Sequence, residues 1–387
     1  MHKPTGDAAL IKKINTAIVL ECVLTQAPLS RTQISERTGL NKATVSNLVQ
    51  DLIAGDLVRE IGMGESSGGR KPVMLLFNEQ AGYAVGIDLG VGYLRGVLAD
   101  LKGGVVMEAE RSFKSRSVDD VVPLLHDCIA ELIAAAPPSP YGIVGIGIGV
   151  PGIVDSEGSM LFAPNLEWKH VPLRAIVTER FGVPVTIDNE ANAGAQGEQR
   201  YGAGRGIANQ IYVSVGIGIG TGITINKALY KGTNGFSGEL GHLSIALDGK
   251  SCRCGNRGCW ELYASENALL EEAAPLGLDT VEAVVEAAQA GRPEALRLLN
   301  TIGEYLGIGI ANIVNVFNPE AVIIGNSLRL AEPFIDASLR ATVEQRTLSQ
   351  HLSGVRLLYA ELGKQSAVRG AAYYAISEFF DKVKGGA

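Results

Sequence analysis

The sequence predicts an α/β protein in two parts, an N-terminal unit of helices with one hairpin and a larger region of alternating strands and helices. Apolar residues recur at helical spacing near the N-terminus, and from about residue 83 apolar, strand-like runs end in glycine-rich turns. A chain of 387 residues with 46% hydrophobic content is also longer than one ordinary core requires. We therefore divide the chain into residues 1–80 and 81–387.

Composition and charge restrict the location and the partners of the protein. No run of about 18 apolar residues occurs, and polar residues precede the first apolar stretch, so neither a membrane span nor a signal peptide is expected. Five cysteines are an odd number for a disulfide framework, which favours the cytoplasm. Residues 1–80 carry nine Lys and Arg against eight Asp and Glu, a net charge of +1, whereas the remainder carries −8. Contact with nucleic acid would therefore come from the N-terminal unit.

Two helices are predicted within the first 40 residues. The second begins at Ser30, which forms a capping box with Gln33, and it ends at Gly39. The first carries an apolar stripe at helical spacing, and the last residue of the stripe is expected to lie in the core. The stripe consists of Ile11, Ile14, Ile18 and Cys22.

A third helix follows a short turn that contains Gly39. Asn41 can cap this helix, and its buried face is predicted to consist of Val45, Leu48, Val49 and Leu52. Two helices joined by such a turn, the second with small and polar outer residues, are typical of a helix-turn-helix, whose recognition helix enters the major groove of DNA by its N-terminal end. The residues expected to contact DNA on the two helices are Thr32, Lys42, Ala43, Thr44, Ser46 and Asn47.

The segment after the third helix is typical of a wing. Residues 57–61 and 73–77 are strand-like and flank a Gly/Ser-rich tip at 62–69, a pattern that predicts a hairpin. Arg70 and Lys71 at its base are expected to reach phosphates or a minor groove. The alternative is a three-helix docking module with a solvated loop. The order of helix pair, cap and wing favours DNA binding.

A cluster of sulfur and nitrogen ligands stands near residue 250. Cys252, Cys254 and Cys259 fall within eight residues, and His242 precedes the first of them by ten positions. Three thiolates and one imidazole suit a closed, structural zinc site. The alternative is a group of buried free thiols. Glu239 and Glu261 flank the cluster, and a bound metal would bring them together.

The body of the chain shows one theme twice, a strand followed by a glycine-rich turn and a second strand. This theme near residues 86 and 216 suggests two related halves that face a cleft. Glycine-rich turns can bind phosphate, but neither turn fits a P-loop or a dinucleotide-binding motif, so nucleotide binding stays open. The strand-like runs are 83–88, 94–100, 145–152 and 212–222, and helices are expected at 121–135 and 173–181.

Five segments resemble the ROK family of repressors, open reading frames and sugar kinases. They are Asp88-Leu89-Gly90, Gly149-Val150-Pro151-Gly152, Asp188-Asn189-Glu190-Ala191-Asn192, Gly238-Glu239-Leu240-Gly241-His242 and the Cys252/Cys254/Cys259 cluster. The resemblance covers essentially the whole chain, and within the family residues 68–73 and 163–168 are most similar to bacterial xylose repressors. It implies a winged helix-turn-helix followed by a two-lobed, actin-like (sugar kinase/ribonuclease H-like) domain with a sugar between the lobes.

Departures from the pattern of the family's kinases imply a receptor instead of an enzyme. The kinases carry a general-base Asp where this chain has Glu190, and a misplacement of about 1 Å can cost roughly a hundredfold in rate. Val91-Gly92 replaces the usual Gly-Thr of the first phosphate turn, and Asn326 interrupts the paired glycines of a second. We therefore expect no catalytic residue.

The resemblance also implies the ligand site and the function. It carries over six sugar-binding residues, of which His242 would also bind the metal, and Trp168 would form part of the wall or pack in the core. The expected protein is a homodimeric or higher-order repressor that binds operator DNA and is released by a monosaccharide, D-xylose. Two alternatives stay open: an ATP-dependent sugar kinase with an accessory DNA-binding arm, and a repressor inactivated by a partner protein. The six residues are Asn165, Asn189, Glu190, Glu239, His242 and Glu261.

Overall fold

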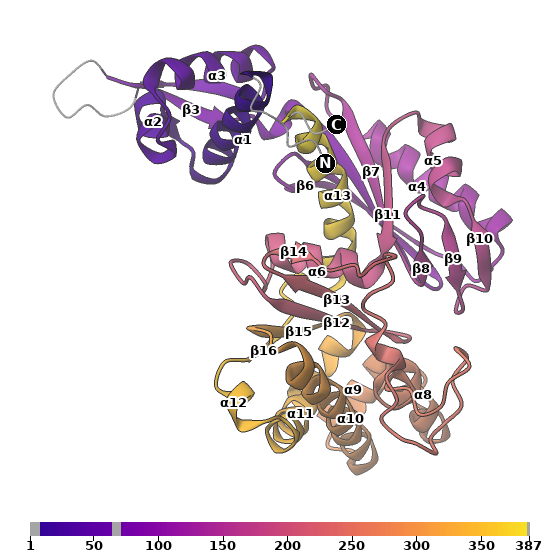
Figure 1. The fold of residues 1–387 in the computed structure, drawn as a ribbon. Helices are drawn as coiled ribbons and strands as arrows, with labels where there is room; N and C mark the ends of the chain where they lie inside the picture. Colours follow the sequence, from indigo (N-terminus) through magenta and orange to yellow (C-terminus); the bar gives the residue numbers. More distant parts are fainter. Residues whose placement is uncertain (1–7, 64–70, 385–387) are drawn as a thin grey trace.

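The computed structural model describes residues 8–63 and 71–384, which form a winged helix-turn-helix and two α/β lobes. Figure 1 shows the winged helix-turn-helix at one end, the lobe that follows it in sequence in the middle, and a second lobe at the other end. We call the two lobes the upper and the lower lobe. No helix of the described residues is long and apolar enough to span a lipid bilayer.

The winged helix-turn-helix forms where the capping residues predict it. Ser30 and Gln33 make both hydrogen bonds of the capping box, Gly39 ends the second helix with a φ of 72°, and the Asn41 side chain accepts from the Thr44 amide at 2.8 Å. The hairpin is also confirmed, since its strands pair antiparallel. The elements are α1 (Ala8–Gln26), β1 (Leu29–Ser30), α2 (Arg31–Thr38), α3 (Lys42–Ala54), β2 (Val58–Met63) and β3 (Val73–Phe77).

The predicted stripe of α1 is only partly a core face. Cys22 is buried, as expected, but Ile11, Ile14 and Ile18 are 39–52% exposed. All residues from 9 to 14 are exposed, so this half of the helix lies at the surface. The helical periodicity predicted the helix correctly but not how far its packing partners extend. The residues that α1 contributes to the core are Val19, Leu20, Cys22 and Val23.

The upper lobe is built on a five-stranded sheet of order β11-β7-β4-β5-β6, with a small sheet β10-β9-β8 beside it. The buried residues of α4 and α5 pack with those of the sheet in one core. Both predicted helices are confirmed within a few residues. The elements are β4 (Tyr83–Leu89), β5 (Tyr93–Asp100), β6 (Val105–Ser112), α4 (Val118–Ala134), β7 (Ile143–Val150), β8 (Ile153–Val154), β9 (Met160–Ala163), β10 (Trp168–Val171), α5 (Leu173–Phe181) and β11 (Val185–Asn189).

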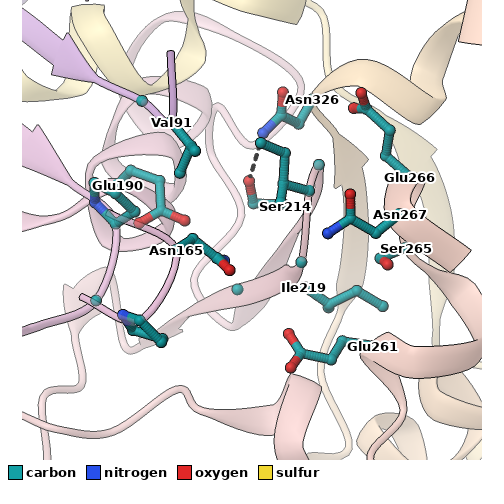
Figure 2. A pocket seen from close by; sticks show the side chains of 18 of the residues that line it. Val91, Asn165, Glu190, Ser214, Ile219, Glu261, Ser265, Glu266, Asn267 and Asn326 are labelled. Atoms are coloured by element: carbon teal, nitrogen blue, oxygen red, sulfur yellow. Dashed lines mark hydrogen bonds between the residues drawn. The ribbon is translucent and has the colours of Figure 1, made fainter. Parts of the chain in front are cut away.

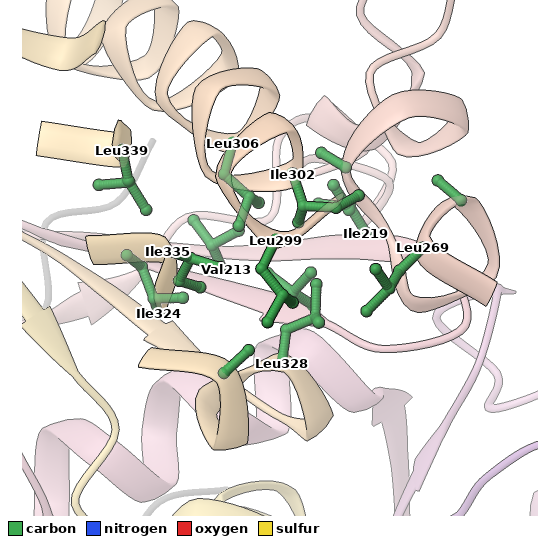
Figure 3. Close-up of a cluster of buried hydrophobic side chains, with 14 of the residues drawn as sticks. Val213, Ile219, Leu269, Leu299, Ile302, Leu306, Ile324, Leu328, Ile335 and Leu339 are labelled. Atoms are coloured by element: carbon green, nitrogen blue, oxygen red, sulfur yellow. The ribbon is translucent and has the colours of Figure 1, made fainter. Parts of the chain in front are cut away.

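The lower lobe has a second five-stranded sheet, of order β14-β13-β12-β15-β16, covered by a helical layer. Figure 3 shows Leu299, Ile302 and Leu306 of α10 packed above this sheet. The elements are β12 (Gln210–Val215), β13 (Ile219–Ile225), β14 (Ala228–Leu229), α7 (Glu261–Ala264), α8 (Glu266–Ala273), α9 (Val281–Gln289), α10 (Pro293–Phe317), β15 (Ala321–Gly325), α11 (Glu332–Arg346), α12 (Ser349–Leu352) and β16 (Arg356–Tyr359).

The two sheets share one topology. In each, a central strand pairs antiparallel with the next strand in sequence (β4 with β5, β12 with β13) and parallel with a later one (β4 with β7, β12 with β15). A further strand then pairs in parallel with that later strand, β11 beside β7 and β16 beside β15. The prediction of two related halves is therefore confirmed.

Two long helices cross between the lobes. Helix α6 (Glu190–Tyr201) follows the last strand of the upper sheet but packs on β12 and β13 of the lower sheet. Helix α13 (Ser366–Val383), yellow in Figure 1, follows the last strand of the lower sheet but packs on β4 and β7 of the upper sheet. The two helices also pack on each other, so their crossing is a contact between the two lobes.

Candidate functional site

A cleft of about 730 Å³ lies between the lobes, and its walls include the two glycine-rich turns that the sequence singled out. Gly90 and Val91 come from the turn between β4 and β5, and residues 216–218 from the matching turn of the lower lobe. All six residues predicted to bind a sugar line this cleft: Asn165, Asn189, Glu190, Glu239, His242 and Glu261. Figure 2 shows Asn165 and Glu190 on one side of it and Glu261 across from them.

Asn189 and Glu190 stand together at the start of α6, where the last upper strand enters the cleft. The Asn189 side chain caps the helix, since its oxygen accepts from the Ala191 amide at 2.8 Å, and its nitrogen donates to the Gly152 carbonyl at 3.1 Å. Both ends of this amide therefore already have partners. Glu190 is the first helical residue, and its carboxylate has an oxygen that is buried without a hydrogen-bond partner among the described residues.

Burial perturbs two carboxyl groups, Glu190 in the cleft wall and Asp88 in a small pocket that adjoins it. Burial, with the charges of Asp88 and Glu239 nearby, raises the pKa of Glu190 to about 8. Burial also raises the pKa of Asp88 to about 6, against the opposing effect of the Arg95 guanidinium, 3.7 Å away. Arg95 stacks on the Tyr93 ring at 4.0 Å. Desolvated groups of this kind gather at binding sites, because a ligand can supply the missing partners.

The cysteines and the histidine of the predicted metal site come together beside the cleft. One ligand atom from each of His242, Cys252, Cys254 and Cys259 lies within 4.8 Å of the other three. The Cys254 and Cys259 sulfurs are 3.7 Å apart, and the Cys252 sulfur is 3.7 Å from Nδ1 of His242. These four residues can therefore hold one metal ion.

Two carboxylates connect the cysteine and histidine cluster to the cleft. Glu261 Oε1 lies 3.4 Å from His242 Nδ1 and accepts from the Cys252 thiol at 3.3 Å. Glu239 Oε2 lies 3.8 Å from Nε2, on the other side of the ring. The two imidazole nitrogens thus face different surroundings. Nδ1 faces the Cys252 sulfur and Glu261, and Nε2 faces Glu239.

Sequence reasoning missed much of the cleft. Asp88, Tyr93 and Arg95 were not predicted as site residues, although Asp88 belongs to a quoted motif and the other two share the next strand. Part of the lower-lobe wall was missed as well. There the Asn326 amide donates to Ser214 Oγ at 3.1 Å, a hydrogen bond drawn in Figure 2, and the Ser327 hydroxyl donates to Glu266. The sequence signal for this part of the wall was the altered glycine pair around Asn326.

Trp168 does not line the cleft. It is 2% exposed, packs in the upper-lobe core, and its indole nitrogen donates to the Arg116 carbonyl at 2.6 Å. Of the two roles considered for this residue, packing in the core is therefore the correct one.

The predicted DNA-contacting face is accessible. The predicted core face of α3 is buried as expected, and Asn41 fixes its N-terminus. Thr44 is half-buried, and Arg70 lies outside the described residues. The other predicted contact residues are exposed: Thr32, Lys42, Ala43, Ser46, Asn47 and Lys71.

The repeated sheets and the cleft between them define the actin-like fold of sugar kinases and their relatives, here preceded by a helix-turn-helix unit. More specifically, the chain belongs to the ROK family, whose family model matches residues 84–378, while the IclR helix-turn-helix domain matches residues 15–62. The resemblance inferred from the sequence is therefore confirmed.

Three known proteins illustrate the similarity. The xylose repressor of Bacillus subtilis is 45% identical over 384 residues, 98% of this chain and 99% of that protein. A crystal structure of a ROK family transcriptional regulator, a homolog of the Escherichia coli MLC protein, has a TM-score of 0.83 at 29% identity, over 97% of this chain and 99% of the other. A ROK family glucokinase from Streptomyces griseus, in complex with glucose and AMPPNP, has a TM-score of 0.67 at 31% identity, over 76% of this chain and 99% of the other.

Proposed function

We propose that this protein is a sugar-responsive transcriptional repressor that binds operator DNA through α3 and releases it when a monosaccharide occupies the cleft. The observation that carries the proposal is that one chain holds an accessible recognition helix and an interlobe cleft lined by all the expected sugar-binding residues. Such a protein works where the operator is, in the bacterial cytoplasm.

The inducer is D-xylose, a proposal supported by the similarity to the xylose repressor of Bacillus subtilis. Carboxylates and amides from both lobes can bind several hydroxyls of one sugar at once, which favours the closed arrangement of the lobes. Asn165, Glu190, Glu239 and Glu261 are the direct partners, and the Nε2 side of His242 faces the ligand. Asn189 lines the site and positions Glu190 through its cap.

An operator titration with and without saturating xylose tests this proposal. Because binding linkage is reciprocal, xylose must weaken operator binding by the same factor by which operator weakens xylose binding. A panel of pentoses and hexoses in a thermal-shift assay identifies the inducer independently, since a ligand of the folded state raises its stability by RT ln(1 + [L]/Kd). Operator affinity unchanged by xylose removes it as inducer, and insensitivity to every sugar leaves a partner protein as the regulator.

The DNA contacts come from the exposed N-terminal end of α3 and from the base of the wing. Lys42 and Lys71 bind phosphates, and Ser46 and Asn47 face base edges together with Ala43 and Thr44. Thr32 on α2 and Arg70 at the wing complete the contact set. A homodimer, which would place two such units on one duplex, is part of this proposal.

The cleft does not transfer phosphate in this proposal. Glu190 stands where the kinases of the family have an aspartate, and Val91 offers no hydroxyl to a phosphate. Burial also keeps Glu190 protonated at neutral pH, which opposes its use as a general base. A coupled assay of ATP turnover with glucose, N-acetylglucosamine and xylose decides between repressor and kinase. Turnover at ordinary enzymatic rates favours the kinase.

The metal is zinc, held by His242, Cys252, Cys254 and Cys259 in a structural role. A tetrahedral site with Zn–S bonds of about 2.3 Å places two sulfurs about 3.8 Å apart, close to the 3.7 Å between Cys254 and Cys259. Zinc would cross-link the loop 252–259 to the segment that carries Glu239, and so would fix Glu239 and Glu261 at the cleft wall. Elemental analysis of the purified protein tests the identity of the metal.

A further inference from the structure

The winged helix-turn-helix is joined to the upper lobe by a shared hydrophobic core. Ala375, Ile376 and Phe380 of α13 belong to the same buried cluster as Leu20, Leu29 and Phe77 of the winged helix-turn-helix. The rings of Phe77 and Phe380 are 5.9 Å apart. A contact of this kind resists relative motion, whereas a flexible tether would permit it.

Polar contacts reinforce this core at its edges. The hydroxyl of Tyr141, which lies just before β7, donates to the Gly55 carbonyl at the end of α3 at 2.7 Å, and its ring packs on Phe379 at 5.0 Å. The Lys384 ammonium lies 3.6 Å from the Glu21 carboxylate of α1. The buried core of the lower lobe, in contrast, includes no residue of the winged helix-turn-helix among the residues described.

Helix α13 is also fixed to the upper sheet, because its backbone lies directly on two glycines. A Cβ atom on Gly147 of β7 would lie 1.8 Å from the Ala371 carbonyl oxygen, and one on Gly86 of β4 would lie 2.3 Å from the Val368 oxygen. At both points the nearest atom of the helix is a backbone atom. The 18 residues of α13 span about 27 Å, so one rigid element reaches from the cleft region to the winged helix-turn-helix.

The lower lobe holds α6 in a similar way. A Cβ atom on Gly222 of β13 would lie 2.5 Å from the Ala191 carbonyl oxygen of α6, one residue beyond Glu190 at the cleft. Where α6 meets α13, a Cβ atom on Gly370 would lie 1.7 Å from the Ala193 oxygen, and one on Gly197 would lie 2.1 Å from the Ser366 oxygen. The crossing is thus a backbone contact between two helices that belong to different lobes.

We propose that the winged helix-turn-helix and the upper lobe move as one body, with α13 as the strut that joins them. The α6–α13 crossing is the pivot about which sugar binding at Glu190 rotates this body against the lower lobe. The inference rests on the proposed function and specifies its regulation. Operator binding then responds to the angle between the lobes instead of to a change within the winged helix-turn-helix.

Distances between pairs of spin labels test this inference in the full-length protein. Exposed positions are available on each part: Glu36 on α2, Ala130 on α4 of the upper lobe and Glu344 on α11 of the lower lobe. A genetically encoded ketone residue carries the label, so that the native cysteines stay unmodified, and dilution with unlabelled protein isolates distances within one chain. Xylose should shift the 36–344 distance and leave the 36–130 distance unchanged. A shift in the 36–130 distance, or no shift in any pair while xylose still weakens operator binding, overturns the inference.

Two variants test the strut through the coupling factor, the ratio of operator affinities without and with xylose. Phe380→Ala removes the ring that α13 contributes to the shared core. Tyr141→Phe removes only the hydrogen bond from its hydroxyl to Gly55, a change that the fold should tolerate. Both should lower the coupling factor severalfold and leave xylose affinity unchanged. Tyr359→Phe, which removes a hydroxyl bond to Asp336 within the lower lobe, is the matched control and should leave the factor unchanged.

The outcomes separate the two proposals. If xylose has no effect on operator binding by the unmodified protein, the proposed function is wrong. If the unmodified protein responds to xylose and both Phe380→Ala and Tyr141→Phe respond as strongly, only the strut is refuted.

Discussion

Replacing Glu190 with Gln should stabilise the protein at neutral pH while it weakens sugar binding. The folded state raises the pKa of Glu190 from 4.5 to about 8, mainly by burial. Asp88 on β4 and Glu239 raise this pKa further. The other ionisable groups that line this end of the cleft are Tyr93, Arg95, Tyr212 and Lys364. Glutamine has nearly the same shape and carries no charge. Its burial therefore does not require the proton that Glu190 must bind when it is buried.

The magnitude follows from the linkage of proton binding to folding. Between pH 4.5 and about 8 the folded protein holds a proton on Glu190 that the unfolded chain has lost, so the free energy of unfolding falls by about 1.4 kcal/mol per pH unit. From pH 5 to pH 7.5 this amounts to roughly 3 kcal/mol. The variant lacks this dependence. Its advantage over the unmodified protein should therefore grow by about 3 kcal/mol over that interval.

Urea denaturation of both proteins at several values of pH between 5 and 7.5 measures this difference. Asp88, whose pKa is raised to about 6, is present in both proteins, so its own contribution largely cancels. Glu344→Gln, a change at an exposed site, is the control and should leave the pH dependence unaltered. A difference between the Glu190→Gln and unmodified proteins that stays constant over the interval would refute the reasoning. Xylose affinity should fall by about tenfold in the variant, as expected for the loss of one hydrogen bond between the carboxyl group and the sugar.

Three further predictions concern other parts of the molecule. Cys254→Ser should reduce bound zinc below one ion per chain and lower the midpoint of thermal unfolding. Cys22→Ser, which lies outside the cluster, should leave the zinc content unchanged. Equal zinc contents in the two variants would contradict the proposed ligand set. Glu198→Gln should lower the free energy of unfolding, measured in urea, by about 3 kcal/mol. The buried Glu198 carboxylate accepts hydrogen bonds from the Glu361 and Leu362 amides and from the Ser366 hydroxyl. An unchanged stability would show that these bonds are dispensable. Lys42→Ala should reduce the slope of log K against log [salt] for operator binding by about one unit, and should weaken binding to all DNA sequences alike. A titration at several salt concentrations checks this. An unchanged slope would exclude a phosphate contact.

The sequence was sufficient to predict features that depend on neighbouring residues. The caps at Ser30 and Asn41 define the helices that they begin, and the repeated strand and turn predicted two halves because each repeat is a local hairpin. The cluster that can hold a metal ion was also predictable, since Cys252, Cys254 and Cys259 are close in sequence and require little tertiary information.

Features that depend on distant segments could not be predicted in the same way. Lys364 and Glu266 line the same cleft as Val91, but no local pattern links positions so far apart. The charge of Arg95 acts on Asp88 only because β4 and β5 pair in one particular register. The exposure of Ile14 depends on where the neighbouring helices end, and helical periodicity contains no such information.

The position of Phe380 has a consequence for biosynthesis. Phe77 and Phe380 share one core but are separated by 303 residues. The ribosome therefore makes the part of this core that α13 contributes long after it has made the helices of the winged helix-turn-helix. At roughly 5–20 residues per second this interval lasts on the order of 15 to 60 s, during which apolar side chains of a nascent regulator stay uncovered. Chaperones can bind that surface in the meantime.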